Sequence, residues 1–302
     1  MSARFTRGLA LAGLLALGCG KSAGFTADDA GTDTGTDTDT DVDSDTDTDT
    51  DTDAPDAGVS FSDGVTLWLA PESIPSTTDA IATWPDSSGN GHDAVQGDSA
   101  HQPHLASNAV NGLAVPFFDG TSSYLTVPYF PLFSNESSGA TIVVVFVSSD
   151  PASDQRFVFV QEQTLCVNNF EIGYHTGDQD RPNFGLHAGC GMADVTSANI
   201  DNQWHVYTVR VLPEGTPPAN VEIFIDGVKQ ATEMDSGGFP GPGSYGTDAN
   251  DVQIGARDDN GSMVLDGFLN GYLGELMVFD KALDDTQRSA VEVHLKAKFG
   301  TP

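Results

Sequence analysis

From about Val59 to its end, the chain alternates short apolar runs with clusters of Gly, Asp, Asn and Pro that recur every 8 to 15 residues. Apolar runs this short, separated by turn-forming residues, predict strands that pack as an all-β sandwich or barrel. Asp226 and Gly227, between two apolar residues, give the strongest hairpin signal in the chain. The clearest predicted strands are residues 65–69, 141–147, 156–161, 205–211, 221–225 and 274–279.

One convincing helix is predicted, at the C-terminal end. Asp284 can cap its first turn, Gln287 three residues later completes a capping box, and Gly300 ends the helix. Its apolar residues share one face at helical spacing: Val291, Leu295 and Phe299. We expect this helix to cover the sandwich without organising it.

Residues 1–18 have the pattern of a signal peptide. Arg4 and Arg7 precede an apolar stretch over residues 9–17, which is far too short to span a bilayer. Leu15-Ala16-Leu17-Gly18-Cys19 resembles the bacterial lipobox, although that family usually has Leu three places before the cysteine, where Ala16 stands here. The resemblance implies lipid attachment at Cys19. Gly20 then implies sorting to the outer membrane or cell surface. The alternative is an incidental cysteine in an ordinary signal peptide.

Residues 19–58 are predicted to be a disordered tether between the lipid anchor and a domain over residues 59–302. Asp stands at every second position from Asp37 to Asp53, and the segment has almost no large apolar residue. Such a segment cannot offset the entropy of ordering, and its like charges repel one another. A random coil of this length separates its ends by roughly 35 Å. Calcium collection by the aspartates is the less favoured alternative.

The charge of the chain excludes some partners. It has 44 acidic residues against 12 Lys and Arg, and the tether carries only 13 of the acids. The domain is therefore strongly acidic itself, which argues against nucleic acid and against anionic lipid surfaces as partners.

With Cys19 lipidated, Cys166 and Cys190 remain as an even pair in an exported protein. This count predicts a disulfide between them. Two free buried thiols are the alternative.

Seven stretches follow one another in order: Leu67-Trp68-Leu69 with 83–94, Phe118-Asp119-Gly120 with Tyr124-Leu125, 141–146, Trp204-His205-Val206, Phe224-Ile225-Asp226-Gly227, Ile254-Gly255-Ala256, and 271–276 with Ala282-Leu283 and the terminal helix. Together they resemble laminin G-like domains of the concanavalin A-like lectin/glucanase superfamily. The resemblance implies a two-sheet antiparallel jelly-roll sandwich with one short C-terminal helix. Apolar alternation alone would also allow an immunoglobulin-like sandwich.

Members of that superfamily either cleave polysaccharides or only bind them. The glucanase branch carries alternating carboxylates on one strand, and we identify no such strand in the sequence. The chain also has no His-Glu-x-x-His helix and no Gly-x-Ser-x-Gly elbow. We therefore expect a non-catalytic binding domain for a carbohydrate or another surface polymer. The alternatives are a divergent glycoside hydrolase and a protein-binding adhesin or scaffold.

A structural calcium ion is the expected ion chemistry, because calcium prefers several hard oxygen ligands from loops. The predicted ligands are Asp86, Asn90 and Asp93 around a glycine-rich turn, with Asp280 from the other end of the domain. An Asx-turn, in which Asp86 only caps its own loop, is the alternative.

Loop residues with aromatic, amide or charged groups are the usual readers of sugars. The predicted ligand-binding residues are Tyr129, Tyr174, Tyr245, Arg257, Asp259 and Asn260. Trp68, Trp84 and Trp204 lie in strand-like contexts and are expected in the core.

Overall fold

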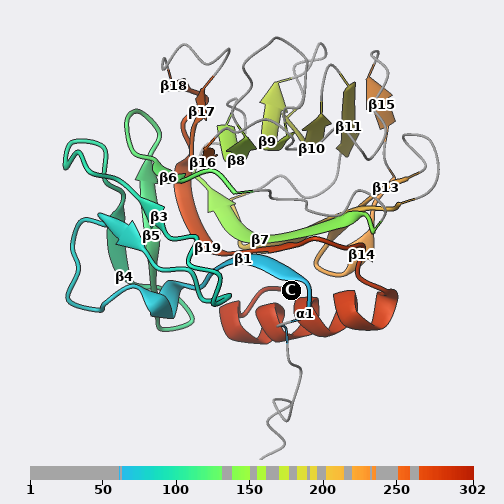
Figure 1. Cartoon of the computed structure of the whole chain (residues 1–302), viewed down its shortest axis with the longest axis horizontal. Coiled ribbons are helices and arrows are strands. Elements are labelled where there is room, and N and C mark those ends of the chain that lie inside the picture. The colour runs from blue at the N-terminus through green and yellow to red at the C-terminus, as the bar shows by residue number, and fades with distance from the viewer. Residues whose placement is uncertain are drawn as a thin grey trace, which may run out of the picture. The chain divides into compact units, whose positions relative to one another are not determined.

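The computed structural model describes residues 61, 63–130, 138–149, 155–160, 170–176, 182–188, 191–195, 202–213, 220–231, 233–235, 251–258 and 265–302. They form two packed antiparallel sheets with one α-helix (Figure 1). The predicted signal peptide, tether and anchor at Cys19 lie outside these residues, as do Cys166 and Cys190. None of the helices within the described ranges has the length and apolar character needed to cross a membrane.

The first sheet, called sheet A here, has eight strands in the order β14-β13-β12-β7-β19-β5-β4, with β1 paired to β19. Its strands are β1 (Val65–Leu69), β4 (His104–Val110), β5 (Leu113–Asp119), β7 (Ala140–Ser148), β12 (His205–Val211), β13 (Val221–Ile225), β14 (Val228–Lys229) and β19 (Asn270–Phe279). The two longest strands, β7 and β19, pair with each other at its centre.

The second sheet, sheet B, has nine strands in the order β15-β11-β10-β9-β8-β16-β6-β3-β2. Its strands are β2 (Thr83–Trp84), β3 (Ala94–Val95), β6 (Leu125–Val127), β8 (Gln155–Val160), β9 (Phe170–Thr176), β10 (Pro182–Ala188), β11 (Gly191–Val195), β15 (Glu233–Asp235) and β16 (Val252–Ile254). A separate hairpin pairs β17 (Arg257–Asp258) with β18 (Leu265–Asp266). A 3-10 turn, η1 (Pro71–Ser73), follows β1.

The main core fills the space between the two sheets. Ile142 and Val144 of β7 belong to it, whereas Val143 and Val145 of the same strand belong to a second apolar cluster on the other side of sheet A. Because both faces of β7 are buried, the strand reads as a continuous apolar run without alternation.

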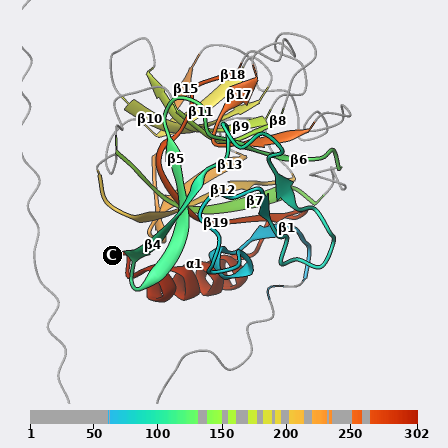
Figure 2. The same ribbon diagram turned by 90° about the vertical axis from the view of Figure 1, so that its left-hand side faces the viewer.

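Helix α1 (Asp285–Phe299) packs on the outer side of sheet A (Figure 2). Gln287 N donates to Asp284 Oδ1 at 2.8 Å, and Asp284 N donates to Gln287 Oε1 at 3.2 Å, which completes the predicted capping box. Gly300 adopts a left-handed φ of 66° and ends the helix. The predicted jelly-roll sandwich with one short C-terminal helix is confirmed.

Candidate functional site

The predicted calcium residues gather around the start of β1. Asp86 Oδ1 accepts hydrogen bonds from the backbone N–H groups of Trp68 and Ser88, and Oδ2 accepts from Ser88 Oγ and His92 N, over distances of 2.7 to 3.1 Å. Burial raises the pKa of Asp86, but these hydrogen bonds outweigh burial and hold the pKa below its usual value. The carboxylate thus caps the loop and ties it to β1, as an Asx-turn would.

Asn90, Asp93 and Asp280 belong to the same neighbourhood. Asn90 Nδ2 donates to the carbonyl oxygens of residues 65 and 66 at 3.1 Å, and Asp93 Oδ1 accepts from Asp86 N at 2.8 Å. Asp280 N donates to Gly64 O at 2.9 Å, so the far end of the domain does meet this loop. Within the described ranges, no group of three or more His, Cys, Asp or Glu side chains is arranged to hold a metal. The calcium site stays a prediction.

The predicted ligand-binding residues do not form one cluster. Tyr129 is exposed, and its N–H donates to Asp251 Oδ1 at 2.8 Å, just before β16. Arg257 lies beyond the other end of β16 and forms a two-point ion pair with Asp266 across the β17–β18 hairpin, at 2.7 and 2.8 Å. Tyr174 occupies a register position on β9 two residues after Ile172, a core residue. The remaining three lie outside the described residues: Tyr245, Asp259 and Asn260.

The three tryptophans have different environments. Trp84 is fully buried, and its Nε1 donates to Ala70 O at 2.9 Å, which confirms its core assignment. Trp68 is half-buried and donates from Nε1 to Glu275 Oε1 at 2.6 Å. Trp204 is also half-buried, and it lines a pocket.

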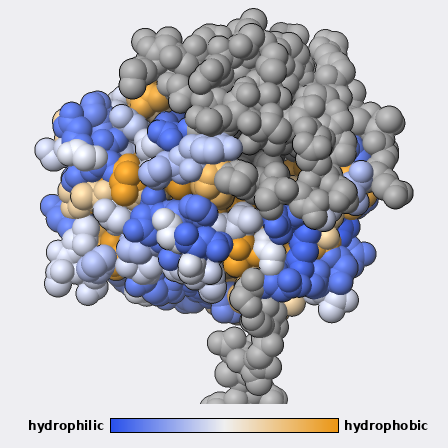
Figure 3. Space-filling model, viewed as in Figure 1, coloured by the Kyte–Doolittle hydropathy of each residue, from blue (hydrophilic) through white to orange (hydrophobic). Residues whose placement is uncertain are grey.

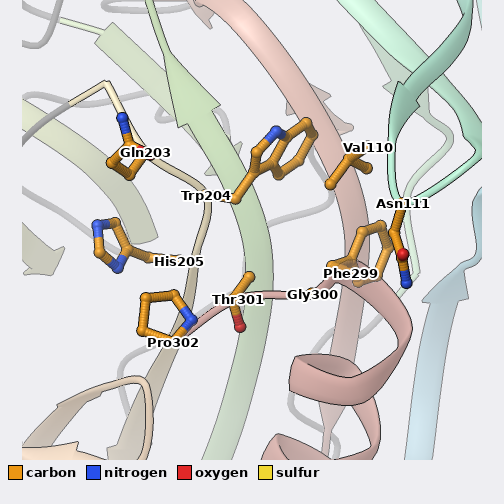
Figure 4. Close-up of a pocket in the computed structure, with 9 residues that line it drawn as sticks. All are labelled: Val110, Asn111, Gln203, Trp204, His205, Phe299, Gly300, Thr301 and Pro302. Atoms are coloured by element: carbon orange, nitrogen blue, oxygen red, sulfur yellow. The ribbon is translucent and has the colours of Figure 1, made fainter.

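This pocket of about 530 Å³ lies where the β4–β5 turn, the segment before β12 and the C-terminal end of α1 meet (Figure 4). Several of its polar groups already serve the fold. His205 Nδ1 lies 2.6 Å from Asp226 Oδ2, and Asn111 Nδ2 donates at 2.9 Å to the carbonyl of Lys298 in the last turn of α1. The pocket is therefore a gap between packed elements beside the C-terminal end of α1, and its polar groups mainly hold those elements together. Its lining residues are Val110, Asn111, Gln203, Trp204, His205, Phe299, Gly300, Thr301 and Pro302.

The outer face of sheet B is the side of that sheet turned away from the core. Val252 and Ile254 of β16 are core residues, so Gln253 between them lies on the outer face. By the same alternation, Thr126 of β6 lies on this face, between Leu125 and Val127. Their side chains meet there, since Thr126 Oγ1 donates to Gln253 Oε1 at 2.8 Å.

One row of directly paired residues crosses the whole sheet on this face, because cross-strand partners share a face. From β2 to β15 the row reads Thr83, Val95, Thr126, Gln253, Phe159, Glu171, His187, Met192 and Asp235. A second row, two residues along each strand, reads Gly173, Gly185, Asp194 and Glu233. The face thus combines hydroxyl, amide, carboxylate, imidazole and aromatic positions around a pair of glycines.

The structure corrects the expectation that no strand carries alternating carboxylates. Glu233 and Asp235 occupy alternate positions of β15 and therefore share a face. Asp194 of β11 is the direct cross-strand partner of Glu233. A three-residue strand has too few positions to show an apolar alternation, so the sequence pattern gave no signal for β15.

Comparisons with known proteins agree with this architecture. A family model described as "Concanavalin A-like lectin/glucanases superfamily" matches residues 119–287. Among solved structures, domain 4 of AbnA, a GH43 extracellular arabinanase from Geobacillus stearothermophilus in complex with arabinotriose, is similar at 13% identity and a TM-score of 0.50, over 76% of this chain and 98% of that chain. A receptor binding domain is similar at 13% identity and a TM-score of 0.50, over 78% of this chain and 51% of that chain. No curated protein sequence gives a significant match. At such identity the structural likeness establishes a shared fold.

Proposed function

This chain belongs to the concanavalin A-like lectin/glucanases superfamily, and from that premise we propose that it is a lipid-anchored, non-catalytic protein that binds a carbohydrate on the outer face of sheet B. The observation that carries the proposal is the row of hydroxyl, amide, carboxylate and imidazole positions across that face. Such groups select the hydroxyls of a sugar, while an aromatic position such as Phe159 suits its C–H face.

The other broad face is closed. Helix α1 covers the outer side of sheet A, where Val143 and Val145 need an apolar partner. On the side of the molecule that Figure 3 shows, the described surface is mostly hydrophilic and its apolar patches are small and separate. The acidic charge of the chain favours neutral over anionic glycans.

The proposal keeps three expectations from the sequence. Lipidation at Cys19 would hold the protein at the outer membrane or cell surface, and a Cys166–Cys190 disulfide would brace the domain. A structural calcium ion would sit among Asp86, Asn90, Asp93 and Asp280 and would supply loop rigidity, without taking part in any chemistry. Mass spectrometry under non-reducing conditions would reveal the disulfide as a loss of two hydrogens.

The test is a neutral-glycan array followed by calorimetric titration with arabinotriose, the ligand of the similarly folded arabinanase domain. We expect saturable binding that Thr126→Arg abolishes, because a long cation would then lie on the proposed face. Val293→Arg on the exposed side of α1 is the matched control and should bind like the wild type. If calcium is structural, a chelator should lower both the melting temperature and the affinity. Binding of surface proteins without any glycan binding would favour the adhesin alternative and overturn the proposal.

A second candidate function, glycoside hydrolysis, is favoured by Glu233, Asp235 and Asp194. Directly opposed residues of antiparallel strands have Cβ atoms about 4.5–5.5 Å apart, which is compatible with a pair of catalytic carboxyl groups. A reducing-end assay on polysaccharides would decide between the two functions. Release of sugar ends that Glu233→Gln abolishes, with ligand binding retained, would establish hydrolysis. Binding without any release would leave the non-catalytic function.

A further inference from the structure

Gln253 on the outer face of sheet B is a buried amide that the fold uses only in part. Its exposed fraction is 7%. Oε1 accepts the hydrogen bond from Thr126 Oγ1 at 2.8 Å, whereas nothing in the described part of the structure accepts a hydrogen bond from Nε2. Nε2 is not one of the fully enclosed side-chain atoms that lack a partner in the described residues, so solvent reaches this donor and it is open to a ligand.

The position of this amide is fixed before any ligand arrives. Gln253 and Thr126 are direct cross-strand partners, and each lies between two core residues of its own strand. The backbones of β6 and β16 are thereby held by the core, and the threonine hydroxyl holds one end of the amide. The free end is a preset hydrogen-bonding group, which lowers the entropy lost on binding.

Gln96 is an equally buried amide in which, unlike in Gln253, both the oxygen and the nitrogen form hydrogen bonds within the fold. It also has an exposed fraction of 7%, and it follows Val95 at the end of β3. Its Oε1 accepts from Asp98 N at 3.0 Å, and its Nε2 donates to Tyr124 O at 3.3 Å. Both ends of this amide therefore serve the fold, which makes Gln96 a matched control for Gln253.

We propose that Gln253 reads the bound carbohydrate by donating from Nε2 to one of its hydroxyl or ring oxygens, and that Thr126 acts as the positioning residue. This inference rests on the proposed carbohydrate-binding function of the same face. Val95 lies two strands away in the same row with an exposed fraction of 37%, and it offers an apolar contact for the C–H side of the sugar.

The test compares Gln253→Met with Gln96→Met in the purified full-length protein, measuring affinity and stability for each. The probe is arabinotriose or, where it does not bind, the oligosaccharide that binds tightest on the array. We expect Gln253→Met to weaken binding by about tenfold, as the loss of one hydrogen bond would, and to lower the unfolding midpoint no more than Thr126→Val does, because both variants break the same Thr126–Gln253 hydrogen bond. Gln96→Met should lower the unfolding midpoint and leave affinity unchanged. Thr126→Val should weaken binding by about threefold, because the amide is then free to rotate.

The outcomes separate the inference from the proposed function. Wild-type binding that Gln253→Met and Thr126→Val leave unchanged would overturn the role of Gln253 and preserve carbohydrate binding by the face. Absence of any glycan binding by the wild type would overturn both. If Gln253→Met does not fold, Thr126→Val decides alone, since it removes only the hydroxyl that orients the amide.

Discussion

Glu275 is a carboxylate buried under α1, and its partner Lys298 offers a direct test of how the helix is held. Its exposed fraction is 1%. Oε1 accepts from Trp68 Nε1 at 2.6 Å, and Oε2 lies 2.5 Å from Lys298 Nζ, which also pairs with Glu72 at 2.7 Å. Lys298→Met removes the cation and leaves the buried carboxylate without a counter-charge.

We expect Lys298→Met to lower the free energy of unfolding by about 3 kcal/mol at neutral pH, which is the lower end of the range for breaking a buried ion pair. The lower end applies because the Lys298 side chain is 15% exposed, so water can replace part of its contribution. For a domain of this size, that loss lowers the melting temperature by about 6–12 °C.

The pH dependence follows from the pKa of Glu275. Burial raises this pKa, although Lys298 and Trp68 lower it, and the net direction is upward. A raised folded-state pKa means that the group's stabilising contribution is complete below the unfolded pKa and is lost as pH rises through the folded pKa. Loss of Lys298 raises the folded pKa further. The deficit of the variant should therefore shrink when pH falls from 7 to about 4.

The assay is urea unfolding followed by tryptophan fluorescence at both pH values. Lys296→Met is the matched control, because within the described residues Lys296 Nζ on the same helix donates to a backbone carbonyl, Asp226 O at 3.2 Å, and forms no ion pair. Adding Glu275→Gln to Lys298→Met should restore part of the lost stability. Equal midpoints for Lys298→Met and Lys296→Met at neutral pH, or a deficit that does not shrink in acid, would refute this account of Glu275.

Three further predictions concern other parts of the chain. Asp119 accepts hydrogen bonds from three N–H groups and two hydroxyls of the next turn, which outweigh burial and place its pKa well below the usual value. Asp119→Asn should lower the free energy of unfolding by about 1 kcal/mol at pH 7, a small value because Asp119 is largely exposed. The difference in stability between wild type and variant should vanish as pH falls through the folded-state pKa of Asp119. Gly255 has a φ of 85°, and a Cβ there would lie 2.4 Å from the buried ring of Phe118. Gly255→Ala should therefore lower the free energy of unfolding by at least about 2 kcal/mol in the same urea assay; an unchanged midpoint would contradict the geometry. Cys19→Ser should move the protein from the membrane to the soluble fraction and abolish labelling by a palmitate analogue, whereas retention of label would place the lipid elsewhere.

Local patterns predicted much of this fold, because some elements are determined by neighbours in the sequence. The caps of α1 at Asp284 and Gly300 are such signals, and so is the apolar run of β7. The strand β15 depends instead on pairing with β11, a partner about 40 residues away in the chain. Glu233 and Asp194 were therefore missed as neighbours. The sequence also gave no indication that Gln253 pairs through Oε1 and keeps Nε2 available as a donor, because its partner Thr126 comes from a distant strand.

The difference between the outer faces of the two sheets follows from a few alternate positions. On sheet A these positions hold Val143 and Val145, whose apolar side chains are stable only under a cover, and α1 supplies it. On sheet B the equivalent outward positions hold Thr126 and Gln253, which need hydrogen-bond partners and no apolar cover. The outer face of sheet A is therefore covered by the chain's own helix. On the outer face of sheet B, Gln253 Oε1 accepts from Thr126 and Nε2 remains as a donor, for which a sugar oxygen is a suitable acceptor.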